Sequence, residues 1–561
     1  MPGLHSIART IRRKELQRAM LQRISLRGRR DQVELGLACL ALLGLELLIL
    51  WPHIKRGGFY YDDWSHASAY RFVGYRELAT DSWRDLIPGR PVLAFLIPLP
   101  HALFGLNASY HLVVAAALSG LASWAFFVFL RHLGIGSGHA LGLAALSLVF
   151  PWSDAVRLWP TASLNNVSLI AYFLGTVAAL RGLSEKTRPS RRRAVLLHLT
   201  AAILYVISIL TYEVAAGAIL LSGVLYRTRA SWRIVRKRWL FDACLVVGLL
   251  LVSLVLTARV RYVGSPEQRL SDLGRFVTDG LSIFASMFLP HGVTSTAAKL
   301  LVLAAAAAVA AGSLILVRRR NALELQMWLW CGAAGVAAVA LGYVIFVGSG
   351  LFPSYSGVDD RANTFAAFGF VAATYSTMAL VSLIVARRPG RLAAAILATS
   401  TALVGLGSAQ RLRIDVDHFD AATIWQDNEL ARLRAALPRP PHGSTIFSFG
   451  YPATSAPGVP IFWAQWDLRG AIRLSWDDES LHALPVYGRG VSCGRTAVHA
   501  LEFADENAAE YRERPVFVDL STGEARHVRS RIDCLDARLA FRPGRFVAGR
   551  DPPKRTAGQP G

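Results

Sequence analysis

Long apolar runs separated by short basic clusters dominate roughly the first 400 residues of the chain. A helix that crosses a bilayer needs about 20 mostly apolar residues, and the hydrophobic pattern predicts eleven such spans. The run at 139–150 is short and is followed by a proline. The pattern therefore predicts an α-helical polytopic membrane protein. The predicted spans are residues 35–51, 110–130, 139–150, 162–180, 194–210, 214–226, 240–257, 300–317, 327–347, 364–386 and 392–406.

The basic clusters orient these spans. They occur at the N-terminus and after the second, fourth, sixth, eighth and tenth predicted spans, so all of them fall on one side. Lys and Arg gather in cytoplasmic loops, which predicts an N-terminus inside and a C-terminus outside the plasma (inner) membrane. No small-residue cleavage site follows the first run, so it is predicted to be retained. A net charge of +23 alone would suit nucleic acid, but this clustering argues against a nucleic-acid partner.

Composition changes near residue 408 and divides the chain into three parts. We expect a basic cytoplasmic segment at 1–34, a membrane domain at 35–407 with a first outer loop at 53–109, and an extracytoplasmic domain at 408–561. Short aromatic and β-branched runs broken by Gly and Pro predict that the last part is a small α+β or mostly β domain. Outside the cytoplasm a disulfide between Cys493 and Cys534 becomes plausible.

Ionisable side chains gather on the predicted outer side, next to the membrane. A carboxylate there can act as a general base, and two adjacent carboxylates repel, which raises one pKa. The guanidinium fork matches phosphate oxygens, so the set suits an amphiphilic phosphate substrate. An Asp pair alone is typical of a solvated turn, but its position among aromatic residues directly after the first span favours a site. The candidates are Asp62 and Asp63 in "YYDDW", Arg90, Arg157, Glu213, and Asp359, Asp360 and Arg361 in "DDRAN".

This layout resembles the GT-C superfamily of polyprenyl-phosphate-sugar-dependent glycosyltransferases, including protein O-mannosyltransferase-like and O-antigen glucosyltransferase-like proteins. The resemblance rests on the acidic pair Asp62 and Asp63 in a long first outer loop, followed by "GRPVLAFLIPLPHALFGLNASYHLV". It implies that one Asp is the catalytic base, with Asp63 slightly favoured over Asp62. His66 is interpreted as a surface residue. No metal-binding motif stands out, so dependence on a divalent metal stays open.

The leading hypothesis is a membrane glycosyltransferase that moves a sugar from a polyprenyl-phosphate donor to an envelope glycan, lipid or protein. Arg361, assisted by Arg90 or Arg157, would hold the donor phosphate. A transporter or flippase of lipid-linked sugars is a rival, disfavoured by the small number of charges in the centres of the spans. A non-catalytic scaffold that presents the C-terminal domain is a second rival.

Overall fold

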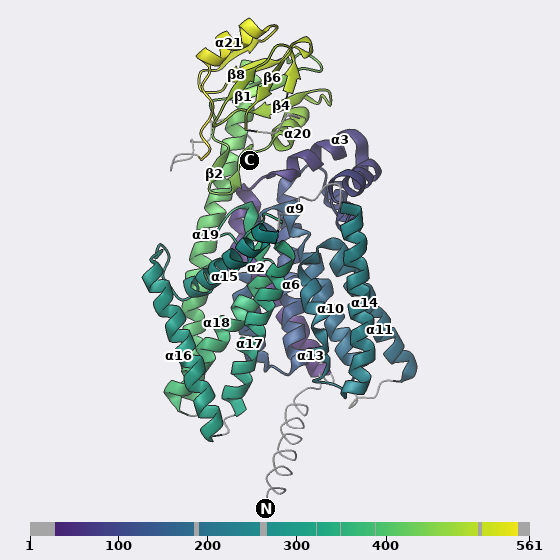
Figure 1. Cartoon of the computed structure of the whole chain (residues 1–561), viewed down its shortest axis with the longest axis vertical. Coiled ribbons are helices and arrows are strands. Elements are labelled where there is room, and N and C mark those ends of the chain that lie inside the picture. Colours follow the sequence, from purple (N-terminus) through teal and green to yellow (C-terminus); the bar gives the residue numbers. More distant parts are fainter. Residues whose placement is uncertain are drawn as a thin grey trace, which may run out of the picture.

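The computed structural model describes residues 29–184, 190–257, 266–320, 323–347, 349–387, 389–502 and 508–547. Most of the basic segment predicted at 1–34, up to residue 28, and the basic loop at 185–189 lie outside these residues. The chain forms a helical bundle with a smaller domain of strands and helices stacked on one end (Figure 1). We refer to this end as the domain end of the bundle.

Nine helices in the described residues are long and apolar enough to cross a membrane. They correspond to nine of the eleven predicted spans, which makes the chain a multi-span membrane protein. Their bounds are α2 Arg29–Arg56, α6 Ala108–Leu133, α10 Asn166–Gly182 with the preceding turn, α11 Arg191–Thr211, α14 Trp232–Thr257, α16 Thr296–Arg320, α17 Leu323–Tyr343, α18 Ala366–Ala386 and α19 Arg391–Ala436.

The other two predicted spans are short or broken. Helix α7 (Ser137–Leu148) has 12 residues, and at 1.5 Å per residue it is about 18 Å long, against a hydrocarbon thickness of about 30 Å. The sixth predicted span consists of η2 Glu213–Ala215, α12 Ala216–Leu220 and α13 Ser222–Tyr226. Irregular backbone at membrane depth is tolerated only where protein surrounds it, and most residues of these pieces are buried. A count of eleven crossings stays a prediction.

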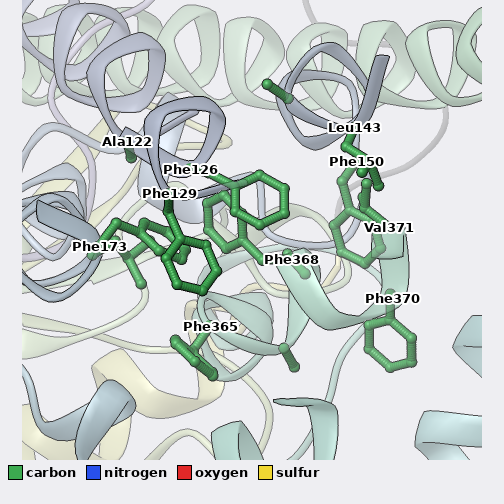
Figure 2. Packing of buried hydrophobic residues seen from close by; sticks show 14 of the residues in the cluster. Ala122, Phe126, Phe129, Leu143, Phe150, Phe173, Phe365, Phe368, Phe370 and Val371 are labelled. Carbon is green, nitrogen blue, oxygen red and sulfur yellow. The ribbon is translucent and has the colours of Figure 1, made fainter. Parts of the chain in front are cut away.

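Phenylalanine rings fill the centre of the bundle (Figure 2). Phe126 of α6 lies 4.9 Å from Phe368 of α18 and 5.3 Å from Phe173 of α10, measured between ring centroids. Such offset and edge-to-face contacts are worth about 0.5–1.5 kcal/mol each beyond area burial. Phe150 directly after α7 joins the same cluster through Phe370, which ties the short helix into the core.

Further helices, most of them short, lie towards the domain end (Figure 1). Pro91 and Pro98 occupy the first turns of two of them, where a missing backbone N–H does no harm. An amphipathic helix, α15, follows between α14 and α16. The bounds are α3 Asp62–Asp81, η1 Ser82–Leu86, α4 Pro91–Leu96, α5 Pro98–Phe104, α8 Ala155–Leu158, α9 Pro160–Ser163, α15 Pro266–Ser286, η3 Val344–Phe346 and η4 Val358–Asn363.

Helix α19 runs without a break for 46 residues, from the bundle into the smaller domain (Figure 1). The boundary predicted at residue 408 therefore lies inside a continuous helix. The composition changes there because the helix leaves its apolar surroundings, whereas the helix itself ends at Ala436, and the C-cap residue Leu437 directly precedes Pro438. A proline disfavours helical geometry in the residue that precedes it.

The C-terminal domain combines helices and strands. Its main sheet has the order β4-β1-β8-β9, with β1 parallel to both neighbours and β9 antiparallel to β8. Every residue of β1 is buried. A disulfide joins Cys493 to Cys534, whose Cα atoms are 5.9 Å apart. The bounds are β1 Thr445–Phe449, β2 Thr454–Ala456, β3 Val459–Pro460, α20 Gln465–Trp476, β4 His482–Pro485, β5 Val491–Cys493, β6 Ala497–Ala500, β7 Ala508–Glu510, η5 Tyr511–Glu513, β8 Val516–Asp519, β9 Glu524–His527 and α21 Arg531–Ala540.

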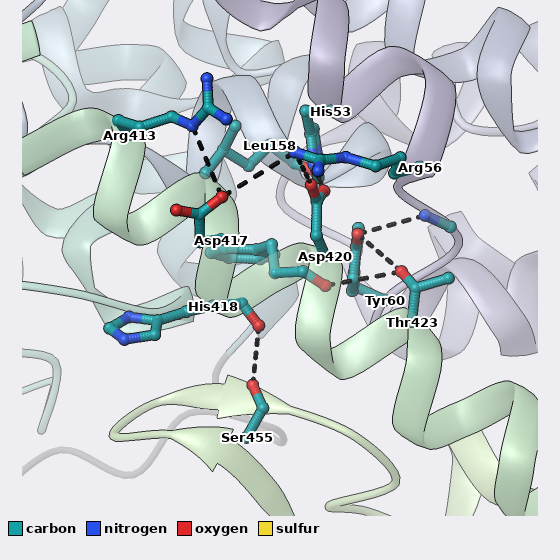
Figure 3. A network of polar contacts seen from close by, with 12 residues as sticks. His53, Arg56, Tyr60, Leu158, Arg413, Asp417, His418, Asp420, Thr423 and Ser455 are labelled. Carbon is teal, nitrogen blue, oxygen red and sulfur yellow. Dashed lines mark hydrogen bonds and ion pairs between the residues drawn. The ribbon is translucent and has the colours of Figure 1, made fainter. Parts of the chain in front are cut away.

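Polar contacts lock the end of α2 to α19 (Figure 3). Asp420 accepts a hydrogen bond from His53 Nδ1 at 2.8 Å and pairs with Arg56 at the same distance. The Tyr60 hydroxyl meets Thr423 Oγ1 at 2.9 Å. His53 and Tyr60 are buried and make these contacts to α19, so the chain just before the acidic pair is fixed relative to the helix that enters the C-terminal domain.

Candidate functional site

A cavity of about 1380 Å³ lies between the domain end of the bundle and the C-terminal domain. The helices that line it include α3, α4, α9, α14 and α20. Both apolar and charged side chains line it. The apolar ones include Leu93, Ile97, Leu250, Leu254, Ile345 and Phe346, and the charged ones include Asp62, Arg90, Glu213, Arg361, Arg469 and Arg473.

Asp62 is the cavity-facing member of the acidic pair. It opens α3, where the helix dipole favours a negative charge. Trp466 Nε1 of α20 donates a hydrogen bond to Asp62 Oδ1 at 2.9 Å, and no other hydrogen bond to this carboxylate forms among the described residues. The second carboxylate oxygen is therefore available to a ligand in the cavity.

Asp63 is buried instead, with 1% of its surface exposed. Asp63 Oδ1 accepts hydrogen bonds from Thr161 N at 2.9 Å and Thr161 Oγ1 at 2.5 Å, and Oδ2 accepts one from Tyr60 N at 2.9 Å. Burial raises the pKa of Asp63 to about 7, against the opposing effect of these hydrogen bonds. Through these hydrogen bonds the Asp63 carboxylate holds the start of α3 against the start of α9.

The backbone at Tyr61 helps to separate the two carboxylates. Tyr61 has φ 47°, a left-handed conformation that is uncommon for a residue with a side chain and is found preferentially at functional sites. Its ring packs against Trp159 and Trp466 at centroid distances of 5.6 and 5.3 Å. Tyr61 therefore changes the direction of the chain between α2 and α3, and α3 begins with the Asp62 side chain facing the cavity.

Arg90 and Glu213 meet in the cavity wall. Arg90 Nε lies 2.8 Å from Glu213 Oε2, and its guanidinium lies 4.5 Å from the centre of the Tyr212 ring. Glu213 is 5% exposed at its side chain, so this is a largely desolvated ion pair. The pair largely neutralises the charge of Arg90 before any ligand arrives.

Arg361 has a different environment. It lines the cavity from η4, and its guanidinium lies 5.5 Å from the centre of the Trp159 ring. Within the described ranges no carboxylate comes within ion-pair distance of it. An arginine held over an aromatic face, with its N–H groups free of carboxylates, is suited to an oxyanion.

Besides Asp63, three predicted residues do not line this cavity. Arg157 is 3% exposed and donates to the carbonyl oxygens of Ser147, Leu148 and Phe150, so it holds the chain after α7. Asp360 is fully buried and accepts from the backbone N–H groups of Asp154 and Ala155, which caps α8. Asp359 is not among the lining residues either.

Sequence reasoning missed two groups in the cavity wall. His66 lines the cavity, and its Nδ1 lies 3.3 Å from Thr161 Oγ1, the hydroxyl that also contacts Asp63. Its pKa is lowered by burial. The other group is helix α20, which lies against α3 (Figure 1). Only its aromatic and basic residues at helical spacing could have indicated it, because nothing local shows that the C-terminal domain folds back on the first outer loop.

No group of three or more His, Cys, Asp or Glu side chains with a metal-binding arrangement occurs among the residues that the structure describes. Metal dependence stays open, as it was from the sequence.

The likeness of this chain to known proteins is structural. No family model matches the chain, and no curated protein matches it. The chain is similar to the crystal structure of ArnT from Cupriavidus metallidurans bound to undecaprenyl phosphate, with a TM-score of 0.40 and 11% sequence identity. The match covers 79% of this chain and 89% of that one.

Proposed function

We propose that this protein is a membrane glycosyltransferase that takes a sugar from a polyprenyl-phosphate donor at the outer face of the plasma membrane. The observation that carries the proposal is the cavity of about 1380 Å³, whose wall combines apolar side chains with Asp62 and Arg361. An amphiphilic donor needs both kinds of surface. The prenyl chain would lie against residues such as Leu250 and Leu254, and the phosphate and sugar would lie near Asp62 and Arg361.

The residues can be given distinct roles. Asp62 would accept the proton of the acceptor hydroxyl as its oxygen bonds to the anomeric carbon. The bond from that carbon to the phosphate oxygen breaks, and its electron pair leaves with the phosphate, which gains one negative charge. Arg361 would stabilise that charge. Trp159 and Trp466, which also line the cavity, offer aromatic faces to the sugar ring. The acceptor would be an envelope glycan, lipid or protein.

This assignment prefers Asp62 to Asp63 as the base. A base must reach the proton that it abstracts, and Asp63 has both oxygens engaged by Thr161 and Tyr60. It also prefers Arg361 to Arg157 as the phosphate ligand, because the Arg157 guanidinium is occupied by backbone carbonyls.

The test is sugar transfer by purified protein from a panel of polyprenyl-phosphate sugars. Asp62→Asn should lower turnover by about 10²–10⁴-fold without loss of folded protein, because Asn can keep the contact with Trp466. Arg361→Lys should also impair transfer, since Lys lacks the planar fork. The matched control is Asp477→Asn, whose carboxylate forms an exposed pair with Arg71. Full activity in Asp62→Asn would refute the proposal. Loss only in Arg361→Lys would indicate a lipid-phosphate binder or transporter.

A further inference from the structure

Helix α20 presents a row of side chains to the cavity. Trp466, Arg469 and Arg473 all line it, and residues spaced by three and seven positions share one side of a helix. Trp466 is the residue that contacts Asp62. At 1.5 Å per residue, Arg469 and Arg473 follow it at about 4.5 and about 10.5 Å along the helix axis. The two arginines therefore lie at increasing distances from the proposed base along the axis of α20.

Neither arginine of this pair is held in a direct ion pair within the described ranges. Among the described residues neither arginine has a carboxylate within ion-pair distance. Arg473 Nε donates to Leu481 O at 2.9 Å, and Arg469 makes no hydrogen bond in the same residues. Burial lowers the pKa of both arginines, and for Arg469 burial alone lowers it. Asp478 and Glu479 act on Arg473 from a distance. Half-buried like charges on one helix face are unfavourable, and a bound oxyanion would relieve that cost.

The row is held rigidly. At Gly470, between the two arginines, a Cβ would lie 2.3 Å from the carbonyl oxygen of Trp64, so α20 packs directly on the backbone of α3. Asp467 is fully buried and accepts from the backbone N–H groups of Trp463, Ala464 and Leu468. This fixes the first turn of α20. Preorganised donors bind an anion without a further ordering cost.

We propose that Arg469 and Arg473 form a second oxyanion subsite, which binds a phosphate or carboxylate group of the acceptor while the acceptor hydroxyl reaches Asp62. The subsite is separate from Arg361, which comes from η4 and lies over Trp159. Its role in acceptor binding rests on the proposed function, but its capacity to bind an oxyanion does not. The C-terminal domain then completes the site by selecting anionic acceptors.

The test measures binding of inorganic phosphate to the full-length protein in detergent, with polyprenyl phosphate present to occupy the donor position. Arg469→Gln/Arg473→Gln should weaken phosphate binding by about tenfold or more for each arginine, as expected for charge-assisted hydrogen bonds. Arg469→Lys/Arg473→Lys should give intermediate binding. Arg495→Gln/Arg538→Gln, which removes two exposed arginines of the same domain, should bind phosphate as the unchanged protein does. Arg361→Gln should weaken binding of polyprenyl phosphate alone.

Unchanged phosphate binding in a folded Arg469→Gln/Arg473→Gln protein would overturn the subsite, as would an equal loss in the Arg495→Gln/Arg538→Gln control. The arm with Asp62→Asn separates the two proposals, because this variant should lose transfer and keep phosphate binding. If no variant affects transfer and phosphate binding still follows Arg469 and Arg473, the subsite stands and the transferase fails. Repeating the titration in nanodiscs with and without anionic phospholipid identifies the source. Competition by a phospholipid that accepts no sugar would assign the subsite to a headgroup and overturn its role in acceptor binding.

Discussion

Gly470 offers a sharp test of whether the C-terminal domain is part of the site. In Gly470→Ala the new Cβ would lie 2.3 Å from Trp64 O, whereas real Cβ contacts are essentially never shorter than 3.0 Å. Helices α20 and α3 must therefore separate by about 0.7 Å. The same shift would stretch the Trp466–Asp62 hydrogen bond from 2.9 Å to about 3.6 Å, which is beyond hydrogen-bonding distance.

The expected effects differ for stability and for turnover. Overpacking costs about 1–3 kcal/mol, and the gain of about 0.5–1 kcal/mol from removing a glycine within a helix offsets part of this. The melting temperature should fall by only a few degrees. Turnover should fall by about tenfold to a hundredfold, because a displacement of about 1 Å in a positioned group has effects of this size.

The assay combines thermal unfolding of purified protein with sugar transfer at saturating donor. Gly407→Ala is the matched control, since this residue lies in α19 and a Cβ added there would have no neighbouring atom within 4 Å. It should leave both properties unchanged or raise stability slightly. If Gly470→Ala behaves like Gly407→Ala in both measurements, α20 does not position Asp62 and the reasoning fails.

Three further predictions concern pH, the disulfide and topology. Burial raises the pKa of Asp63 from 3.8 to about 7, so the folded state binds this proton more tightly than the unfolded state does. The stability gained from this proton is therefore complete below about pH 4 and is lost as the pH rises through 7. The melting-temperature advantage of the unchanged protein over Asp63→Asn should therefore shrink between these values, and a constant difference would contradict the assignment. Cys493→Ser/Cys534→Ser opens a link across 41 residues and should destabilise the C-terminal domain by about 4 kcal/mol, seen as earlier proteolysis of that domain on heating. Reporter fusions after residues 238 and 320 should be cytoplasmic and those after 357 and 441 external, and a cytoplasmic reporter at 441 would refute the predicted orientation.

The sequence predicts the membrane part of the fold well because hydropathy reports directly on long apolar helices. Hydropathy does not show whether an apolar helix is long enough to cross the membrane. The run at 139–150 has the composition of a span, yet α7 is a 12-residue helix packed into the core. The composition change near residue 408 suggests a boundary, although no helix-breaking residue occurs before Pro438 and α19 continues.

The site was predictable where topology alone brings residues together. Asp62, Glu213 and Arg361 follow or precede predicted spans at one end, and all three line the cavity. Arg157 and Asp360 were predicted by the same argument, but their side chains form hydrogen bonds with backbone groups. The sequence does not show which backbone carbonyl and N–H groups need a side-chain partner. The contribution of α20 depends on packing between residues about 400 positions apart, such as Asp62 and Trp466, and no local pattern encodes it.

The unbroken α19 also has an evolutionary consequence. Each residue inserted in it would turn the C-terminal domain by about 100° and raise it by about 1.5 Å relative to the bundle. A single insertion or deletion would therefore carry Trp466 away from Asp62, even at positions where any side chain is acceptable. The length of this helix should be under stronger selection than its composition, so that homologues conserve the spacing between the bundle and Pro438 while the exposed residues of α19 drift.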